Sequence, residues 1–326
     1  MIVARYRWLI VLALAALAAG ICPGGSAIRV QSDLVLINAS VTDSHGNLVN
    51  NVAPSRFHVF EDGLEQVIQS FSGEETPASI GLVLDISGSM GDKLDLAKKS
   101  ALQFVSTANP GDEHFLVEVR QRATVVLPFT NDVNVLLRTI SEVRANGSTA
   151  LFDAIHLAVS EVRRARHARK ALLVISDGLD NHSRYTERET RRLLSELGFP
   201  IYTINLWQPQ RSGSRYAMAR TDPGTLEALA MPTGGRSYTV RDLKQLDQIT
   251  QQISQAIRHE YVLAYVPSPR KPDGKYHRVK VDIDQRAGEP LKVSHRAGYW
   301  APQPASASRP GQGAGSTVEL VDGDHD

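Results

Sequence analysis

The sequence predicts an α/β protein in which a mainly parallel sheet, covered by helices on both faces, lies between two segments of antiparallel strands. Three observations support this fold class. Short continuous apolar runs alternate with amphipathic stretches between residues 79 and 258. Residues 28–76 and 260–300 instead alternate apolar and polar residues between turn signals. The first pattern is typical of buried parallel strands joined by helices, and the second of half-buried antiparallel strands.

The composition is that of an ordinary globular protein. Of the 326 residues, 42% are hydrophobic and 22% are charged, which excludes a chain that is disordered throughout. Lys and Arg number 36 against 35 Asp and Glu. Because so even a balance produces no overall field that selects a polyanion, we expect no nucleic-acid partner.

The first 27 residues have the pattern of a secretory signal peptide. Arg5 and Arg7 precede an apolar run from Trp8 to Ala19, and small residues follow as far as Ala27. The run is shorter than the ~20 residues that usually span a bilayer, so we expect it to be removed. The mature protein is then secreted, or held in the periplasm or cell envelope, without a membrane span. A retained membrane anchor is the alternative.

The single cysteine, Cys22, lies within this segment. Cleavage after Ala27 leaves no cysteine, so no internal disulfide is expected in the mature protein. Lipid attachment at Cys22 is a minority alternative, because Ile21 is not the small residue that bacterial lipoprotein signals place before the cysteine.

The two flanking segments are expected to be β structure. Residues 28–76 contain four or five short strands, with turn signals at 43–47 and 61–63. Residues 260–300 contain strands at 261–266, 277–283 and 291–299. Since neither segment suffices for a sandwich, we expect the two to pair into one. The Pro-, Ser-, Gly- and Gln-rich residues 301–326 are expected to form a disordered tail.

The α/β domain is expected to span residues 79–258. Apolar runs predict strands at 80–84, 115–119, 124–129, 171–176, 201–206 and 237–240. Apolar residues at helical spacing predict helices at 94–105, 133–143, 150–164, 185–197 and 242–259.

Oxygen-bearing side chains follow the first of these strands directly. Asp85, Ser87 and Ser89 occupy positions i, i+2 and i+4, and in an extended loop such positions face one side. Gly88 permits a tight turn between them. Because ligands of open α/β sheets bind at the carboxyl ends of the strands, this loop is a candidate binding site.

Two further oxygen donors occupy comparable places. Thr149 precedes a predicted helix, and Asp177 ends the strand at 171–176. Adjacent parallel strands would bring Asp177 to the same rim as Asp85. The set contains no His or Cys, which favours Mg²⁺, with Mn²⁺ or Ca²⁺ as alternatives, and disfavours zinc or copper. The sequence therefore predicts a metal site with these ligands: Asp85, Ser87, Ser89, Thr149 and Asp177.

In order and spacing, these five residues resemble the metal-ion-dependent adhesion site of von Willebrand factor type A (VWA) domains. The resemblance covers residues 79–258. The flanks resemble those of a bacterial group of secreted proteins with such domains, through 41–43, 57–63, 276–278 and 298–299. The family implies a doubly wound, Rossmann-like domain that binds a protein ligand through the metal and has no catalytic activity. A partner's Asp or Glu carboxylate would complete the coordination.

Two other functions stay open at this point. In a metal-independent envelope scaffold, the β segments would carry the contacts. In a hydrolase, Mg²⁺ would activate water. The sequence contains neither a phosphate-binding Gly-x-x-x-x-Gly-Lys loop nor a Gly-x-Ser-x-Gly nucleophile elbow, and Ser87 stands where a haloacid dehalogenase-type loop needs a second Asp. We therefore expect a binding protein rather than an enzyme.

Overall fold

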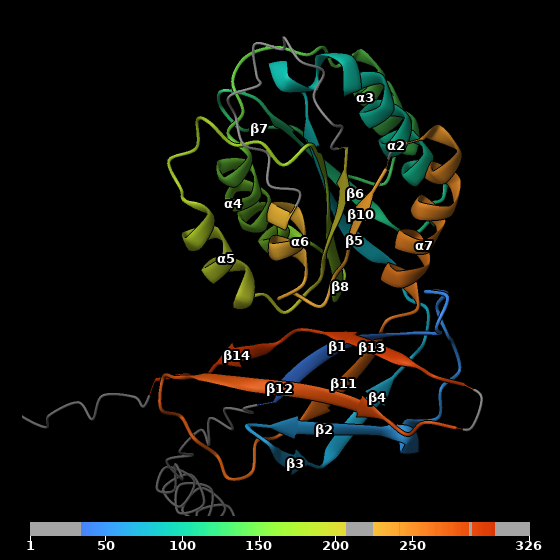
Figure 1. Ribbon diagram of the computed structural model, residues 1–326, viewed down its shortest axis with the longest axis vertical. Coiled ribbons are helices and arrows are strands. Elements are labelled where there is room, and N and C mark those ends of the chain that lie inside the picture. Colours follow the sequence, from blue (N-terminus) through green and yellow to red (C-terminus); the bar gives the residue numbers. More distant parts are fainter. Residues whose placement is uncertain (1–33, 207–223, 241, 287–288, 304–326) are drawn as a thin grey trace, which may run out of the picture. The chain divides into compact units, whose positions relative to one another are not determined.

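The computed structural model describes residues 34–206, 224–240, 242–286 and 289–303. The predicted signal segment, Cys22 and nearly all of the predicted tail lie outside these residues. In the described part, the strands form one six-stranded sheet and two four-stranded sheets, with helices around the first (Figure 1). The predicted fold class is confirmed.

The six-stranded sheet has the strand order β10-β9-β8-β5-β6-β7. All neighbouring pairs are parallel except β6 and β7. The chain starts this sheet at β5, adds β6 and β7 on one side, and then crosses to place β8 on the other side. The point between β5 and β8 is therefore where the strand order reverses. The strands are β5 (Ala78–Asp85), β6 (Glu113–Val119), β7 (Thr124–Thr130), β8 (Arg169–Ser176), β9 (Ile201–Asn205) and β10 (Ser237–Thr239).

Helices cover both faces of this sheet (Figure 1). On one face, α2 (Leu94–Ser106), α3 (Val133–Glu142) and α7 (Leu246–Arg258) pack against Leu82 and Leu84 of β5. On the other face, α4 (Leu151–Glu161), α5 (Glu187–Ser195) and α6 (Gly224–Ala230) pack around Val83. Alternate residues of one strand thus enter two separate cores. Among the described residues, no helix combines the length and hydropathy needed to cross a membrane.

Some helix boundaries differ from those predicted. The helix expected at 150–164 ends at Glu161 and continues as a 3₁₀ turn, Val162–Arg164. The helix expected at 185–197 begins only at Glu187, because Thr186 and Glu189 form a reciprocal capping box there. The start of the helix expected at 242–259 is a 3₁₀ turn, Leu243–Gln245.

The two flanking segments form one β-sandwich. Its sheets have the orders β13-β1-β11-β4 and β14-β12-β2-β3. β1 pairs with β11 and β13, and β2 pairs with β12, so each sheet contains strands from both segments. A single apolar core joins the sheets. The strands are β1 (Val35–Thr42), β2 (Phe57–Glu61), β3 (Leu64–Gln66), β4 (Ile68–Ser72), β11 (Tyr261–Tyr265), β12 (Tyr276–Ile283), β13 (Lys292–His295) and β14 (Gly298–Trp300).

The strand predicted at 291–299 is in fact two strands. β13 pairs with β1 in one sheet, whereas β14 pairs with β12 in the other. The chain therefore passes from one layer of the sandwich to the other around Arg296. Continuous apolar-polar alternation does not reveal such a change of partner.

Gly81 lies in the middle of β5 and is the basis of a stability prediction. A Cβ atom there would lie 2.3 Å from Cζ of Phe115 and 2.4 Å from Cδ2 of Leu172, both fully buried. We expect Gly81→Ala to lower the free energy of unfolding by about 1–3 kcal/mol through overpacking, as measured by urea denaturation. Gly198→Ala is the matched control, since nothing lies within 4 Å of the added Cβ. Equal effects of the two substitutions would contradict this account.

Candidate metal centre

Asp85 is the last residue of β5, at the point where the strand order reverses. Its side chain is fully buried. One carboxylate oxygen, Oδ1, accepts a hydrogen bond from the backbone N–H of Ser87 at 3.0 Å. The other, Oδ2, accepts one from the hydroxyl of Ser176 at 2.6 Å. Because Ser176 ends β8, these bonds hold the carboxylate between the ends of two neighbouring strands.

Ser87 and Ser89 are brought together by a tight turn rather than by the extended loop that the spacing predicts. Ser89 lies in a 3₁₀ helix, η2 (Gly88–Lys93). The N–H of Met90 donates to the carbonyl of Ser87 at 3.0 Å, and the Met90 side chain is completely buried in the core. The turn leaves the Oγ atoms of Ser87 and Ser89 3.0 Å apart.

Backbone hydrogen bonds connect this turn to the loop that carries Thr149. The N–H of Gly88 donates to the carbonyl of Gly147 at 2.8 Å, and the N–H of Asn146 donates to the carbonyl of Ile86 at 2.8 Å. Gly147 has φ +82°, a conformation that favours glycine. The two loops are thus held against each other by main-chain contacts.

The Thr149 loop is in turn bonded to the segment after Asp177. The carbonyl of Thr149 accepts the N–H groups of Asn181 and His182, each at 3.0 Å, and its N–H donates to Oδ1 of Asn181 at 2.9 Å. Thr149 is itself only 1% exposed. Main-chain and side-chain bonds therefore link the three loops that carry the predicted ligands.

Asp177 directly follows β8, and its side chain is 0% exposed. Its Oδ1 accepts the N–H of Leu179 at 3.1 Å. Its Oδ2 forms an ion pair with Nζ of Lys93, the last residue of η2. The side chain of Lys93 is 16% exposed, so both members of this pair are largely shielded from water.

The charge of Asp177 acts on Asp85. Burial raises the pKa of Asp85 to about 6, and the nearby charge of Asp177 contributes to the increase. Hydrogen bonds from Ser176 and Ser87 act in the opposite direction. A buried carboxyl group whose ionisation is disfavoured by a second carboxylate marks a place where a cation is favourable.

The donor set fits a hard divalent cation. It offers carboxylate and hydroxyl oxygens, which are the ligands that Mg²⁺ prefers, and no nitrogen or sulfur. The hydroxyls of Ser87 and Ser89 lie close together, and they and the neighbouring carboxylates of Asp85 and Asp177 are carried by loops that are bonded to one another. The residues present are therefore chemically suited to the metal that the resemblance implies.

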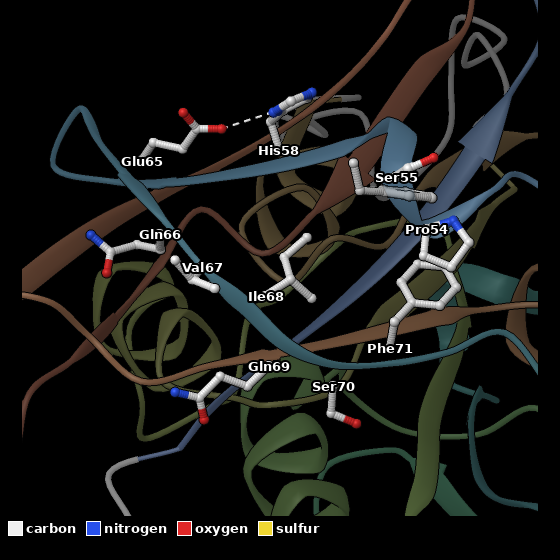
Figure 2. A pocket seen from close by; sticks show the side chains of 11 residues that line it. Pro54, Ser55, His58, Glu65, Gln66, Val67, Ile68, Gln69, Ser70 and Phe71 are labelled. Atoms are coloured by element: carbon white, nitrogen blue, oxygen red, sulfur yellow. Dashed lines mark hydrogen bonds and ion pairs between the residues drawn. The ribbon is translucent and has the colours of Figure 1, made fainter.

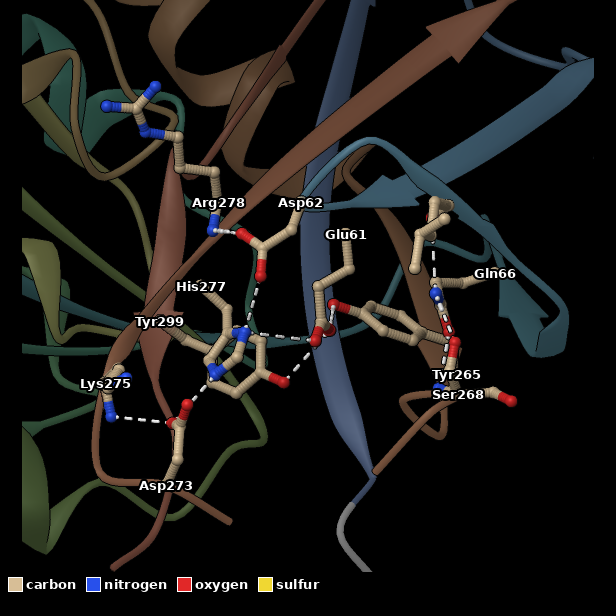
Figure 3. A network of polar contacts seen from close by, with 11 residues as sticks. Glu61, Asp62, Gln66, Tyr265, Ser268, Asp273, Lys275, His277, Arg278 and Tyr299 are labelled. Atoms are coloured by element: carbon tan, nitrogen blue, oxygen red, sulfur yellow. Dashed lines mark hydrogen bonds and ion pairs between the residues drawn. The ribbon is translucent and has the colours of Figure 1, made fainter. Parts of the chain in front are cut away.

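A second polar cluster lies in the β-sandwich (Figure 3). Ligand atoms of Glu61, Asp62 and His277 all lie within 4.8 Å of one another. Nδ1 of His277 is 2.8 Å from Oδ2 of Asp62 and 3.5 Å from Oε1 of Glu61, and Nε2 is 3.1 Å from Oδ1 of Asp273. By distance alone, this group is a further candidate for holding a metal.

Hydrogen bonding explains this cluster without a metal. Both ring nitrogens of His277 face carboxylates, which only accept, so the imidazolium form satisfies every partner. Oε2 of Glu61 accepts the hydroxyls of Tyr265 at 2.7 Å and Tyr299 at 3.0 Å. The cluster is therefore a charged clamp that joins β2 to β12.

A hollow of about 600 Å³ lies beside the edge strands β3 and β4 (Figure 2). The charged groups in its lining, His58 and Glu65, are paired with each other at 2.8 Å. The other lining groups are apolar, hydroxyl or amide side chains. This lining brings together no set of groups suited to catalysis or metal binding, so the rim of the six-stranded sheet is the stronger candidate site.

Sequence reasoning did not predict the roles of three residues, two at the candidate metal centre and one in the polar cluster of the β-sandwich. Lys93 and Ser176 contact the two aspartates through tertiary structure, although both lie within a few residues of the predicted motifs. His277 is separated from Asp62 by 215 positions, and its role becomes visible only when β2 is paired with β12. The turn residues after Glu61 were the one available signal.

Comparisons with known proteins agree with this architecture. A family model described as the von Willebrand factor type A domain matches residues 80–179. An uncharacterized protein of Borreliella burgdorferi is 28% identical over 187 residues, which are 51% of this chain and 54% of that protein. The chain therefore spans about half the length of that curated relative.

Solved structures with a similar fold include a von Willebrand factor type A protein from Catenulispora acidiphila. It is 15% identical, with coverage of 83% of this chain and 75% of that one and a TM-score of 0.48. Proximal thread matrix protein 1 from the mussel byssus, solved with a zinc-occupied MIDAS motif, is 19% identical, with coverage of 60% and 49% and a TM-score of 0.46. The family model matches residues 80–179, within the doubly wound sheet, so the predicted resemblance to von Willebrand factor type A domains is confirmed for this part of the chain.

Proposed function

We propose that this protein is a divalent-cation-dependent binding module that captures a carboxylate of a partner protein. Ser87, Ser89 and Thr149 would hold the metal, and Asp85 and Asp177 would support it directly or through water. Mg²⁺ is the proposed metal, with Mn²⁺ or Ca²⁺ as alternatives. The partner would be a protein that presents an Asp or Glu side chain.

The observation that carries this proposal is the mutual bonding of three loops at the reversal point of the sheet. This is the place where open α/β sheets bind ligands. The bonds hold two neighbouring carboxylates beside two hydroxyls that are 3.0 Å apart. An oxygen-rich rim whose loops are bonded to one another in this way supports cation binding.

The proposed ligands differ in the charge that they would bring to the metal. Neutral hydroxyls from Ser87, Ser89 and Thr149 donate little negative charge to a cation. Asp85, held by Ser176 and by the N–H of Ser87, supplies charge from the buried side. When bound, the metal supplies an electrophilic site for an external anionic oxygen. A partner carboxylate is such an oxygen.

Location and the absence of catalysis are part of the same proposal. The amino-terminal pattern supports a secreted, periplasmic or envelope protein. VWA domains are typically interaction modules, and the rim carboxylates of Asp85 and Asp177 are already bonded to neighbouring N–H groups, to Ser176 and to Lys93. We therefore propose that the protein binds its partner without turning it over.

The test is calorimetric titration of Mg²⁺ and Mn²⁺ into the metal-free chain, with and without acetate as a carboxylate probe. We expect one site per chain, abolished by chelator, with acetate increasing the affinity for the metal. If neither metal binds in the presence or absence of acetate, the metal-dependent function is wrong, and a scaffold carried by the β-sandwich becomes the better account.

A further inference from the structure

Lys93 is the cation that the structure places at the proposed site. Its ammonium group pairs with Oδ2 of Asp177, whose side chain is entirely inaccessible to solvent. In the part of the chain that the structure describes, no other ion pair to Asp177 or Asp85 is present within 4.0 Å. The lysine therefore offsets the charge of two neighbouring carboxylates by itself.

The geometry makes lysine and metal competitors for the same atom. Oδ1 of Asp177 already accepts the N–H of Leu179 at 3.1 Å. Oδ2 is the oxygen directed at Lys93. A cation that uses Asp177 through this oxygen, directly or through a bound water, meets the ammonium group in the same position.

We propose that Lys93 is an internal cation that exchanges with the divalent metal at Asp177 and so sets the metal concentration at which the site fills. The inference rests on the metal site proposed above. Lys93 ends η2, the turn that carries Ser89 and directly follows Ser87. Its side chain is long, flexible and 16% exposed, so it can swing to solvent without moving the hydroxyls.

This exchange has two consequences of opposite sign. Without metal, removal of the lysine leaves Asp177 buried and unpaired beside Asp85, which destabilises the domain. With metal, removal of the lysine takes away a competitor and a like charge, which increases metal affinity. A lysine with only a structural role would lower stability and leave affinity unchanged.

The experiment compares Lys93→Gln with the parent full-length chain, using Mn²⁺ alone as the probe. We expect Lys93→Gln to bind Mn²⁺ at least about tenfold more tightly in calorimetry. In chelator, its thermal unfolding midpoint should fall by about 4 °C or more. Lys93→Arg, which keeps the charge, should restore affinity close to that of the parent. Lys99→Gln, at an exposed lysine of α2, is the matched control and should change neither quantity.

A second measurement needs no variant and so does not depend on folding. In the parent chain, Mn²⁺ should release Lys93 and increase its rate of acetylation several-fold, read by peptide mapping, while Lys99 stays constant. Unchanged acetylation of Lys93 at saturating Mn²⁺ would overturn the exchange.

The outcomes separate this inference from the proposed function. If the parent binds Mn²⁺ and Lys93→Gln binds it no more tightly, the exchange is wrong and the metal site stands. If only Lys93→Gln binds Mn²⁺, lysine excludes the metal from the parent chain, so both the exchange and the metal-dependent function of the parent chain are wrong. If neither binds, both are wrong.

Discussion

Asp85→Asn is expected to weaken Mn²⁺ binding by about two orders of magnitude while leaving the fold intact. Asparagine has nearly the same shape and keeps an oxygen that can accept the N–H of Ser87. Its amide group can donate to Ser176, whose hydroxyl then accepts. The substitution therefore removes the buried negative charge and little else, and calorimetry on the metal-free chain measures the loss.

The fold of this variant must be examined separately from its metal binding. Burial and the charge of Asp177 raise the pKa of Asp85 to about 6. The ionised carboxylate therefore lowers the free energy of unfolding of the metal-free protein at neutral pH. We therefore expect Asp85→Asn to be at least as stable as the parent in chelator at pH 7.

Asp92→Asn is the matched control for this prediction. Asp92 lies in the same turn, η2, but is exposed, so the same loss of charge should change Mn²⁺ affinity much less. If Asp85→Asn keeps the affinity of the parent, Asp85 supports no metal either directly or through water. If both variants lose affinity equally, the general field of the rim, rather than the buried carboxylate, attracts the cation.

Much of the fold could be predicted because local pattern and burial agree. The apolar residues Ala97, Ala101 and Val105 recur at helical spacing, and α2 extends over Leu94–Ser106, close to the predicted 94–105. The continuous apolar run of β5 corresponds to a strand buried along its whole length. Where the apolar residues of an element are buried in the way its type requires, the period of those residues is sufficient to predict the element.

The features that escaped prediction depend on partners distant in the sequence. α6 was not predicted, since its seven residues contribute only Leu226, Leu229 and Ala230 as buried apolar side chains. So short a stretch gives no measurable period. The division of residues 291–299 into β13 and β14 follows from two different pairing partners, which a single strand pattern does not specify.

In the candidate site, too, some features follow from the local sequence and others depend on residues distant in the sequence. The rule that ligands bind at strand ends selects Asp85 and Asp177 from the sequence alone, and Ser87 and Ser89 follow from their spacing. The ion pair of Lys93 with Asp177 requires the actual direction of η2, which the extended-loop expectation did not give. The spacing predicts which oxygens are present, whereas tertiary structure decides which cation faces them.

His277→Gln is expected to lower the free energy of unfolding of the β-sandwich by about 2–4 kcal/mol at pH 6. His277 is 3% exposed and lies between Asp62 and Asp273, with the buried carboxylate of Glu61 nearby. Glutamine can replace one hydrogen bond but not the positive charge. The loss leaves Glu61 with two tyrosine hydroxyls and, among the described residues, without an ion-pair partner within 4.0 Å.

The effect should depend on pH in a defined direction. Burial by itself lowers the pKa of His277, but hydrogen bonds to Asp273 and Asp62 and the charges of Asp62 and Glu61 outweigh it and raise the pKa above 6.5. A raised pKa means that the stabilisation is complete below the unfolded value of 6.5 and is lost as pH rises through the folded value. The gap between the parent and His277→Gln should therefore be larger at pH 6 than at pH 9.

Urea denaturation at both pH values, with hydrogen exchange of the β12 peptide as a local readout, measures this difference. His58→Gln is the matched control. His58 also has a pKa raised chiefly by its hydrogen bond to Glu65, but its side chain is 37% exposed, against 4% for that of His277, so its substitution should cost well under 1 kcal/mol. A cost of His277→Gln that is the same at pH 6 and pH 9 would show that the neutral imidazole, and not the imidazolium, joins β2 to β12.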